Sequence, residues 1–411
     1  MDAPATRIGS MTVMTSQDHI GAPSITGPFA TVMTVIFTGY LVIGIAMPVL
    51  PLHVHQGLGY GTFLVGLVAG SQFAASLISR FTAGHLADSR GAKRVVIAGL
   101  VTASAAGVLY LMSTALLATP ALSLAVLLLG RALLGGAESF LVAGALNWGL
   151  ALAGQKNAGK VMAWVGTAMY VAFAAGAPAG SFLYSVHGFA PVALATILIP
   201  LLNLLLVASL EYVPGSPHAR PAVFGVLRAV WLPGLGLALS SVGFGSITTF
   251  IVLLFARNGW TAAWIALTAV STAFVLGRVL FGHLPDRIDG PRIALVCVLI
   301  EAAGQSLIWL APSPAMAFAG AGLAGLGYSL VYPAFGVEAV RRVPAENRGL
   351  AMGAYTACLD LALGVSAPIL GLVAGEAGLN AVFLASALIV LCATGIALRL
   401  ITFTNSQERV G

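Results

Sequence analysis

The sequence predicts an all-α membrane protein with twelve transmembrane helices, arranged as two six-helix repeats. Charged residues make up only 8% of the 411 residues, 59% are hydrophobic, and the mean hydropathy is +0.99. A soluble protein of this size would expose much of that apolar surface to water. In hydrocarbon the backbone must satisfy its own hydrogen bonds, and apolar runs of about 20 residues without alternation favour helices over a barrel.

Twelve apolar runs are each long enough to cross the bilayer core. They lie at residues 29–50, 61–83, 95–114, 120–146, 161–186, 190–210, 227–255, 262–284, 292–311, 315–337, 349–374 and 380–401. A proline-containing polar stretch separates six runs from six. The predicted domains are a flexible cytoplasmic tail (1–27), a six-helix bundle (28–210), a cytoplasmic linker (211–226), a second six-helix bundle (227–401) and a short cytoplasmic tail (402–411).

Lysine and arginine are distributed unequally between the two sides of the membrane. With a cytoplasmic N-terminus, all but two of the 19 basic residues lie on the cytoplasmic side. The exceptions are Arg131, inside a run, and Arg257, on the outer side. This bias predicts a multi-pass protein of the cell inner membrane with both termini in the cytoplasm. The formal charge of +6 is then a topology signal, and we expect no nucleic-acid partner.

The sequence carries no pattern typical of catalysis or cofactor binding. The three cysteines, Cys297, Cys358 and Cys392, fall inside apolar runs and lack metal-ligand spacing. It contains no phosphate-binding Gly-x-x-x-x-Gly-Lys motif, which argues against direct use of ATP. We therefore predict a non-enzymatic protein without a metal or cofactor, whose partners are the lipid bilayer and a small-molecule substrate.

One short polar motif occurs twice. Residues 84–94, Gly-His-Leu-Ala-Asp-Ser-Arg-Gly-Ala-Lys-Arg, are matched by Gly-His-Leu-Pro-Asp-Arg-Ile-Asp-Gly-Pro-Arg at 282–292, and Arg80 recurs as Arg278. A second match, 190 residues apart, aligns Ala-Pro at 177–178 with Ala-Pro at 367–368. Repetition at this scale predicts a duplicated unit. Because an even number of runs separates the copies, both halves insert in the same orientation.

Three segments carry a resemblance to a known family. Residues 84–94 resemble the signature loop between helices 2 and 3 of the major facilitator superfamily (MFS), with Ser89 and Ala92 in place of the usual bases. Arg131 with Gly135 and Gly136 resembles that superfamily's second motif, and residues 176–180 resemble a loose form of its antiporter motif. Residues 130–135 and 355–365 are similar, more narrowly, to the YhhS/YfcJ group of bacterial permeases. The resemblance implies an MFS fold and a transporter that works by alternating access.

The resemblance also implies a conformational latch in the repeated motif. Its residues would be Gly84, Asp88, Arg90, Gly91, Lys93, Arg94, Gly282, Asp286 and Arg287. We expect Gly84 to allow close helix packing, Gly91 to adopt a positive φ, and Asp88 to accept hydrogen bonds from a neighbouring helix N-terminus. The alternative for the three bases of the first copy is a pure topology signal. Bending of helices is expected at Gly176, Pro178, Gly180 and Pro368.

Two charged residues in the fourth run lie deep in the membrane. Arg131 is eleven residues from the start of that run, which places it about 16 Å deep, near the midplane. A charge at that depth needs a partner or a wet cavity. Glu138 lies seven residues further along the same helix face. A fixed ion pair through an intermediary is one interpretation, and substrate binding or proton coupling is the other.

Asp360 stands alone near the midplane of the eleventh run. The repeat aligns it with Tyr170, and it aligns Glu138 with Tyr328, so each half pairs an acid position with a tyrosine position. Across a central cavity these four would face one another, with Gln72 and Tyr40 as further lining residues. Asp360 is interpreted as a proton carrier, with a buried packing role as the alternative.

The leading functional hypothesis is a secondary active transporter that rocks two bundles around a central site. Proton-coupled efflux of a small organic solute is the expected activity, and the protein is expected to act as a monomer. The direction rests on family analogy alone. Proton symport or facilitated uptake of a sugar-like solute is the runner-up. A non-transporting membrane receptor or scaffold is the alternative from another class.

Overall fold

The computed structural model describes residues 26–154, 157–210, 212, 223–344 and 348–408, and every regular element in these ranges is helical. Most of the predicted tails and of the predicted linker lies outside them. Within the described residues, twelve helical segments are long and apolar enough to span a membrane, as the sequence predicts. Their helices continue past several of the predicted ends, because polar residues at a membrane border can remain helical.

The first six spans are formed by eight helical elements. These are α1 (Thr26–Ala46), α2 (Leu50–Leu52), the π-helical turn η1 (His53–Gly57), α3 (Thr62–Arg90), α4 (Ala92–Ala115), α5 (Pro120–Ala153), α6 (Ala158–His187) and α7 (Ala190–Ala208). The first span breaks after Ala46 because Pro48 and Pro51 each lack an N–H and crowd the preceding turn. Together α1, α2 and η1 make one crossing.

The last six spans also include one broken helix. They consist of α8 (Val223–Arg257), α9 (Trp264–Phe281), the 3₁₀ turn η3 (Leu284–Asp286), α10 (Gly290–Trp309), α11 (Pro314–Tyr328), α12 (Val331–Arg341), α13 (Arg348–Ala377) and α14 (Leu379–Glu408). The break between α11 and α12 falls just before Pro333, whose ring would clash with the carbonyl four residues earlier. Pro178 and Pro368 lie inside α6 and α13, which continue through them.

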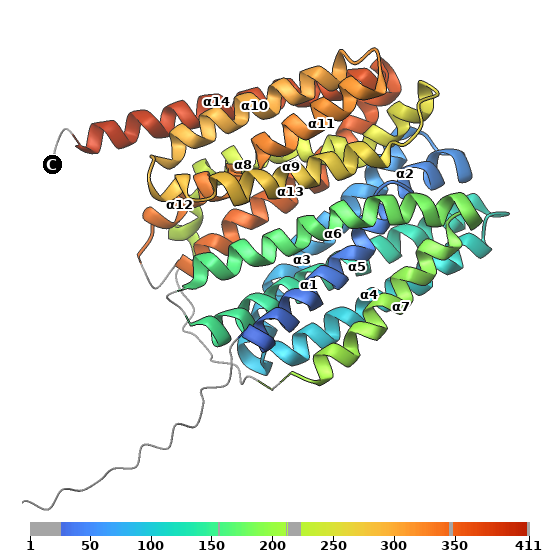
Figure 1. Cartoon of the computed structure of the whole chain (residues 1–411), viewed down its shortest axis with the longest axis horizontal. Helices are drawn as coiled ribbons and strands as arrows, with labels where there is room; N and C mark the ends of the chain where they lie inside the picture. Colours follow the sequence, from blue (N-terminus) through green and yellow to red (C-terminus); the bar gives the residue numbers. More distant parts are fainter. Residues whose placement is uncertain (1–25, 155–156, 211, 213–222, 345–347, 409–411) are drawn as a thin grey trace, which may run out of the picture.

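The helices form two groups that lie side by side (Figure 1). In the first group, α1 packs on α6 and α7, and α4 packs on α5 and α7. In the second group, α8 packs on α13 and α14, and α10 packs on α11 and α14. Two helix pairs, α3 with α13 and α6 with α9, make the main contacts between the groups. Any site shared by the groups must therefore involve these four helices or the residues next to them.

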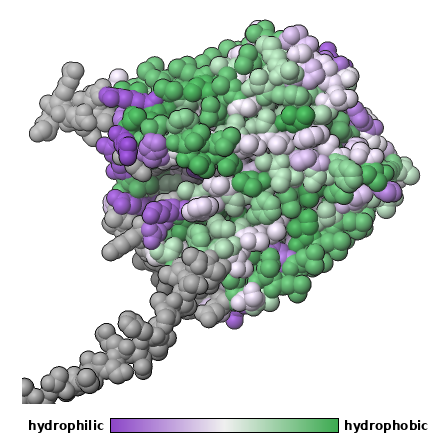
Figure 2. Space-filling view, viewed as in Figure 1, coloured by the Kyte–Doolittle hydropathy of each residue, from purple (hydrophilic) through white to green (hydrophobic). Residues whose placement is uncertain are grey.

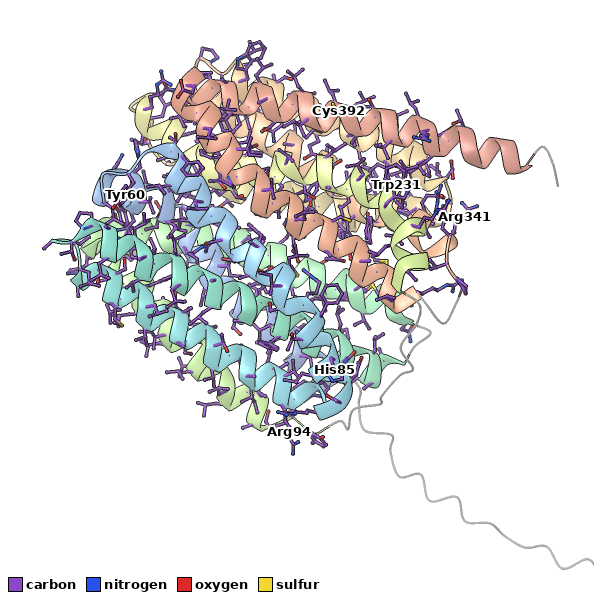
Figure 3. All side chains as sticks on the ribbon, turned by 180° about the vertical axis from the view of Figure 1, so that it is seen from behind. Tyr60, His85, Arg94, Trp231, Arg341 and Cys392 are labelled. Carbon is purple, nitrogen blue, oxygen red and sulfur yellow. The ribbon has the colours of Figure 1, made fainter. Side chains whose placement is uncertain are left out.

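Both the charged side chains and the apolar surface are arranged as in a membrane protein. Figure 2 shows a broad hydrophobic surface on one face of the molecule. Large apolar residues are highly exposed, such as Ile78, Leu205 and Val279 at 78%, 71% and 68%. His85, Arg94 and Arg341 lie at one end of the molecule and Tyr60 at the other (Figure 3). We call these the terminal end, where α1 begins and α14 ends, and the distal end.

Candidate functional site

The two groups of helices are joined by a partly buried ion pair between Arg80 in α3 and Asp360 in α13. Arg80 donates from Nε to Asp360 Oδ2 at 2.8 Å, and its Nη2 contacts the same oxygen. The Asp360 side chain is 2% exposed and that of Arg80 is 21% exposed. The sequence marked Asp360 as a site residue but did not provide its partner. The recurrence of Arg80 as Arg278 beside the repeated motif was the one feature of the sequence that pointed to Arg80.

Two serines connect this ion pair to α5. Ser76, one helical turn before Arg80, donates to Asp360 Oδ2 at 3.4 Å and lies 3.0 Å, oxygen to oxygen, from Ser139. Ser139 also donates to the backbone oxygen of Ser76 at 2.8 Å. The hydroxyls therefore form a short buried path from Asp360 to the residue that follows Glu138.

Glu138 gathers two of the predicted lining residues around its carboxylate. Tyr40 in α1 donates to Oε1 at 3.2 Å, and Gln72 in α3 donates to Oε2 at 2.8 Å. The close approach of α5 to α3 depends on Gly135, where a Cβ atom would overlap the backbone oxygen of Gln72. Gln72, Ser76 and Arg80 thus all belong to α3, and Glu138 is bound to that helix through Gln72.

Arg131 does not form an ion pair with Glu138. Its guanidinium donates to the backbone oxygens of Val68 and Ala69 at 3.2 and 3.4 Å and to the Tyr110 hydroxyl at 3.5 Å. The residue is 6% exposed, and it borders a cavity of about 40 Å³ that is also lined by Gln72. A volume of this size holds water rather than an organic solute. The described contacts hold α5 against α3, and a binding or coupling role for Arg131 stays a prediction.

Tyr170 and Tyr328 belong to an aromatic cluster that spans both groups. The Tyr170 ring in α6 stacks on Phe274 in α9, with centroids 3.5 Å apart and planes at 11°. Phe274 lies 5.9 Å from the Tyr328 ring in α11, and Tyr328 exchanges a 2.9 Å hydrogen bond with Ser241. The tyrosines therefore meet through rings, whereas Asp360 reaches α5 through Ser76 and Ser139. That the four predicted residues face one another across a central cavity stays a prediction.

A tightly packed seam between α3 and α13 closes the distal end. Thr62 donates from its hydroxyl to the Gly371 backbone oxygen at 2.7 Å, and a Cβ atom on Gly66 would overlap the carbonyl oxygen of Ala367. Only glycine permits backbones to approach this closely. The seam continues inward along α3 and ends at the pair formed by Arg80 and Asp360.

The first copy of the repeated motif is mostly helix, which corrects the expected loop. Residues 84–90 complete α3, and Gly91, with φ +83°, is the single residue between α3 and α4. Gly91 therefore adopts the positive φ that was predicted. Gly84 makes no close approach, since a Cβ atom there would meet nothing within 4 Å. That expectation was wrong because Gly84 lies beside the packed face of α3, which Ala83 and Ala87 form.

The charged side chains of this motif bind within the first group. Asp88 accepts a hydrogen bond from the Asn147 side chain in α5 at 3.1 Å, rather than from a helix N-terminus. Lys93 donates to the backbone oxygens of Ala208 and Leu210 at 3.0 and 2.6 Å, which ties α4 to the end of α7. Arg94 lies over the Tyr212 ring, with Cζ 5.6 Å from its centroid. Arg90 is exposed.

The second copy of the motif is folded differently. Gly282 follows the last residue of α9, and the 3₁₀ turn η3 replaces the helical extension seen in the first copy. Arg287 is exposed, and the side chain of Asp286 lies outside the described part of the structure. Because the two copies differ in conformation, a latch formed by both stays a prediction.

The predicted bending residues of the fifth span have a packing role. A Cβ atom on Gly176 would lie 2.6 Å from the carbonyl carbon of Gly44, and one on Gly180 would overlap the backbone oxygen of Ile45. These glycines therefore bring α6 against α1. Bending at Pro178 and Pro368 stays a prediction.

One buried acid lies outside the network around Asp360. Glu301 in α10 is 0% exposed, and neither of its carboxylate oxygens has a hydrogen-bond partner. One turn later, Gln305 donates to the Gly243 backbone oxygen at 2.8 Å and accepts from Ser246 at 3.2 Å. The neighbouring amide thus binds α8, whereas Glu301 does not.

Comparisons with known proteins match this architecture. The family model of the Major Facilitator Superfamily matches residues 32–265 and 234–410. An uncharacterized MFS-type transporter of Pseudomonas aeruginosa is 42% identical over 92% of the chain and 94% of its own length. The uncharacterized MFS-type transporter YhhS of Escherichia coli is 42% identical over 89% and 90%.

Two solved structures share the fold at low sequence identity. An inward-facing, occupied bacterial homolog of the human lysosomal transporter Spinster is 14% identical, with a TM-score of 0.71 over 92% of this chain and 97% of its own. The human organic anion transporter MFSD10 is 15% identical, with a TM-score of 0.65 over 92% and 100%. By its family model and its relatives, the chain belongs to the major facilitator superfamily, a family of non-enzymatic membrane transporters.

Proposed function

We propose that the protein exports a small organic solute across the inner membrane in exchange for protons. Asp360 carries the proton, and Arg80 competes with the proton for the Asp360 carboxylate. The observation that carries this proposal is the position of the pair: it crosses between the two groups of helices at the inner end of the distal seam. Protonation of Asp360 would remove its charge and weaken the contact of α3 with α13.

The distribution of basic residues indicates how the protein is oriented in the membrane. Their excess at the terminal end supports a cytoplasmic location for that end and for both termini. The distal end is then the outer end, and its packed seam corresponds to a state closed to the outside. Two six-helix repeats rock about the central site, and the protein acts as a monomer without a cofactor. The likeness of residues 176–180 to an antiporter motif supports export.

Transport in proteoliposomes tests the proposal. A panel of labelled organic solutes is offered with and without an imposed pH gradient to wild type, Asp360→Asn and the control Glu376→Gln. Glu376 is an exposed carboxylate further along α13. We expect gradient-driven transport in wild type and in the control, and none in Asp360→Asn. Equal proton coupling in Asp360→Asn contradicts the proposal, and movement of solute together with protons favours symport.

A further inference from the structure

Arg278 in α9 is a half-buried cation at the contact between the two groups of helices. Among the described residues, Arg278 belongs to none of the ion pairs. Its guanidinium lies over the Phe274 ring, with Cζ 5.4 Å from the centroid. Such a cation–π contact offsets only part of the cost of removing a guanidinium from water. The Arg278 guanidinium can therefore still form an ion pair with an anion.

The side chain reaches from α9 to the facing helix α6. A Cβ atom on Gly166 would lie 2.6 Å from Arg278 Nη1, so the guanidinium lies directly against α6 at this point. The α6–α9 pair is one of the two helix pairs that join the groups. Arg278 thus lies at a contact that must change if the groups move relative to each other.

Within the described part of the chain, the guanidinium has aromatic neighbours and no acid is paired with it. Tyr170, Tyr328 and Tyr332 are the groups close enough to act on it electrostatically. Tyr170 stacks on Phe274, and Phe244 stacks on Tyr328 with centroids 5.6 Å apart. Flat ring surfaces of this kind suit a planar or apolar body next to an anionic group.

The sequence repeat shows what is missing at this position. Arg278 corresponds to Arg80, and the position that corresponds to Asp360 is Tyr170. The α3–α13 contact therefore contains both a cation and an acid, whereas the α6–α9 contact contains the cation and a tyrosine. An anion supplied from outside the protein would complete the second pair.

We propose that Arg278 binds the anionic group of the transported solute, while Tyr170, Phe274 and Tyr328 contact its apolar part. The solute class is small organic anions, carboxylates or sulfonates, with a planar or apolar body. This assignment rests on the proposed transport function and adds the substrate class to it. A guanidinium fits such groups because it can donate two parallel hydrogen bonds to them.

Calorimetric binding to the purified protein tests this assignment. The probes are naphthalene-2-sulfonate and its neutral counterpart naphthalene-2-sulfonamide, and the variants are Arg278→Gln, Arg278→Lys and the control Arg292→Gln. Arg292 is an exposed base at the start of α10. We expect wild type and control to bind the sulfonate and not the sulfonamide. Arg278→Gln should bind the sulfonate at least tenfold more weakly than wild type. The affinity of Arg278→Lys should lie between the two, since lysine keeps the charge but cannot donate two parallel hydrogen bonds.

Several outcomes overturn the assignment. These are unchanged sulfonate binding in folded Arg278→Gln, equal binding of the neutral probe, or no binding of either probe to wild type. Transport data separate it from the proposed function. If proteoliposomes move only neutral solutes with the pH gradient, the anion site is wrong and proton-coupled transport stands. If the sulfonate binds through Arg278 but no pH gradient drives its movement, the anion site stands and proton-coupled transport is wrong.

Discussion

Arg80 Nε lies 2.8 Å from Asp360 Oδ2, and this contact joins the first group of helices to the second. The two residues are 280 positions apart, and each lies within a membrane-spanning helix. Lipid offers these charges no solvation, so each depends on the other. The pair can therefore stabilise one arrangement of the groups and lose that effect when a proton neutralises the acid.

A double-mutant cycle should show strong coupling between Arg80 and Asp360. Removing one member of a buried pair leaves the other without a partner and costs about 3–5 kcal/mol, somewhat less here because Arg80 is partly exposed. We expect Arg80→Gln and Asp360→Asn each to lower the thermal midpoint of unfolding in detergent. The double variant should regain part of the loss. Purely additive effects would show that the two side chains do not interact in solution.

The seam should tolerate no side chain at Gly66. A Cβ atom there overlaps the Ala367 carbonyl oxygen, so Gly66→Ala must push α3 away from α13. We expect Gly66→Ala to cost about 1–3 kcal/mol in stability or to open the distal end, measured by thermal unfolding and by cysteine accessibility near Thr62. The control is Gly353→Ala in α13, where a Cβ atom meets nothing within 4 Å. Equal behaviour of the two variants would refute the close packing.

Substitution of Arg131 separates a structural role from a coupling role. Its guanidinium reaches two backbone oxygens of α3 and one hydroxyl, and lysine cannot reproduce that geometry. If the contacts are structural, Arg131→Lys lowers stability by about 1–3 kcal/mol, as expected for hydrogen bonds to a charged group. Loss of transport with unchanged thermal stability would instead assign Arg131 to binding or coupling.

The unpartnered carboxyl of Glu301 should be replaceable by an apolar side chain. Both of its oxygens are buried without hydrogen bonds, so Glu301→Leu removes a desolvated polar group of similar size. We expect stability to rise by about 1–3 kcal/mol in thermal unfolding. Gln305→Leu is the matched comparison, and it should be destabilising because Gln305 bonds to α8. A fall in stability for Glu301→Leu would show that the carboxyl has a partner in the protein.

Hydropathy predicted the twelve spans because a bilayer imposes the length and composition of a crossing helix on the sequence. The extension of α3 through residues 84–90 was missed because a polar segment at a membrane border can be helix or loop with the same composition. Gly91 was identifiable because glycine is the residue that adopts positive φ without strain.

Partners across helices were harder to predict than the residues themselves. Gln72 and Tyr40 were identified as polar groups near the midplane, and Glu138 as an acid on the cytoplasmic side of it. Their hydrogen bonds depend on the register that Gly135 allows between α5 and α3. The pairing of Arg80 with Asp360 depends on the register of α3 against α13, which helical periodicity within one segment does not encode. Packing between distant segments decides these contacts.

The distance between the turns at Leu117 and Leu310 tests the central claim most directly. These exposed residues lie at the distal end, one in each group, and can carry spin labels after the native cysteines are replaced. If the closed state loses about 3 kcal/mol of stabilisation by the pair of Arg80 and Asp360, the ratio of closed to open states should change roughly 100-fold. Asp360→Asn should therefore populate a longer distance than wild type, with Glu376→Gln as control. The same distance distribution in wild type and Asp360→Asn would contradict the account.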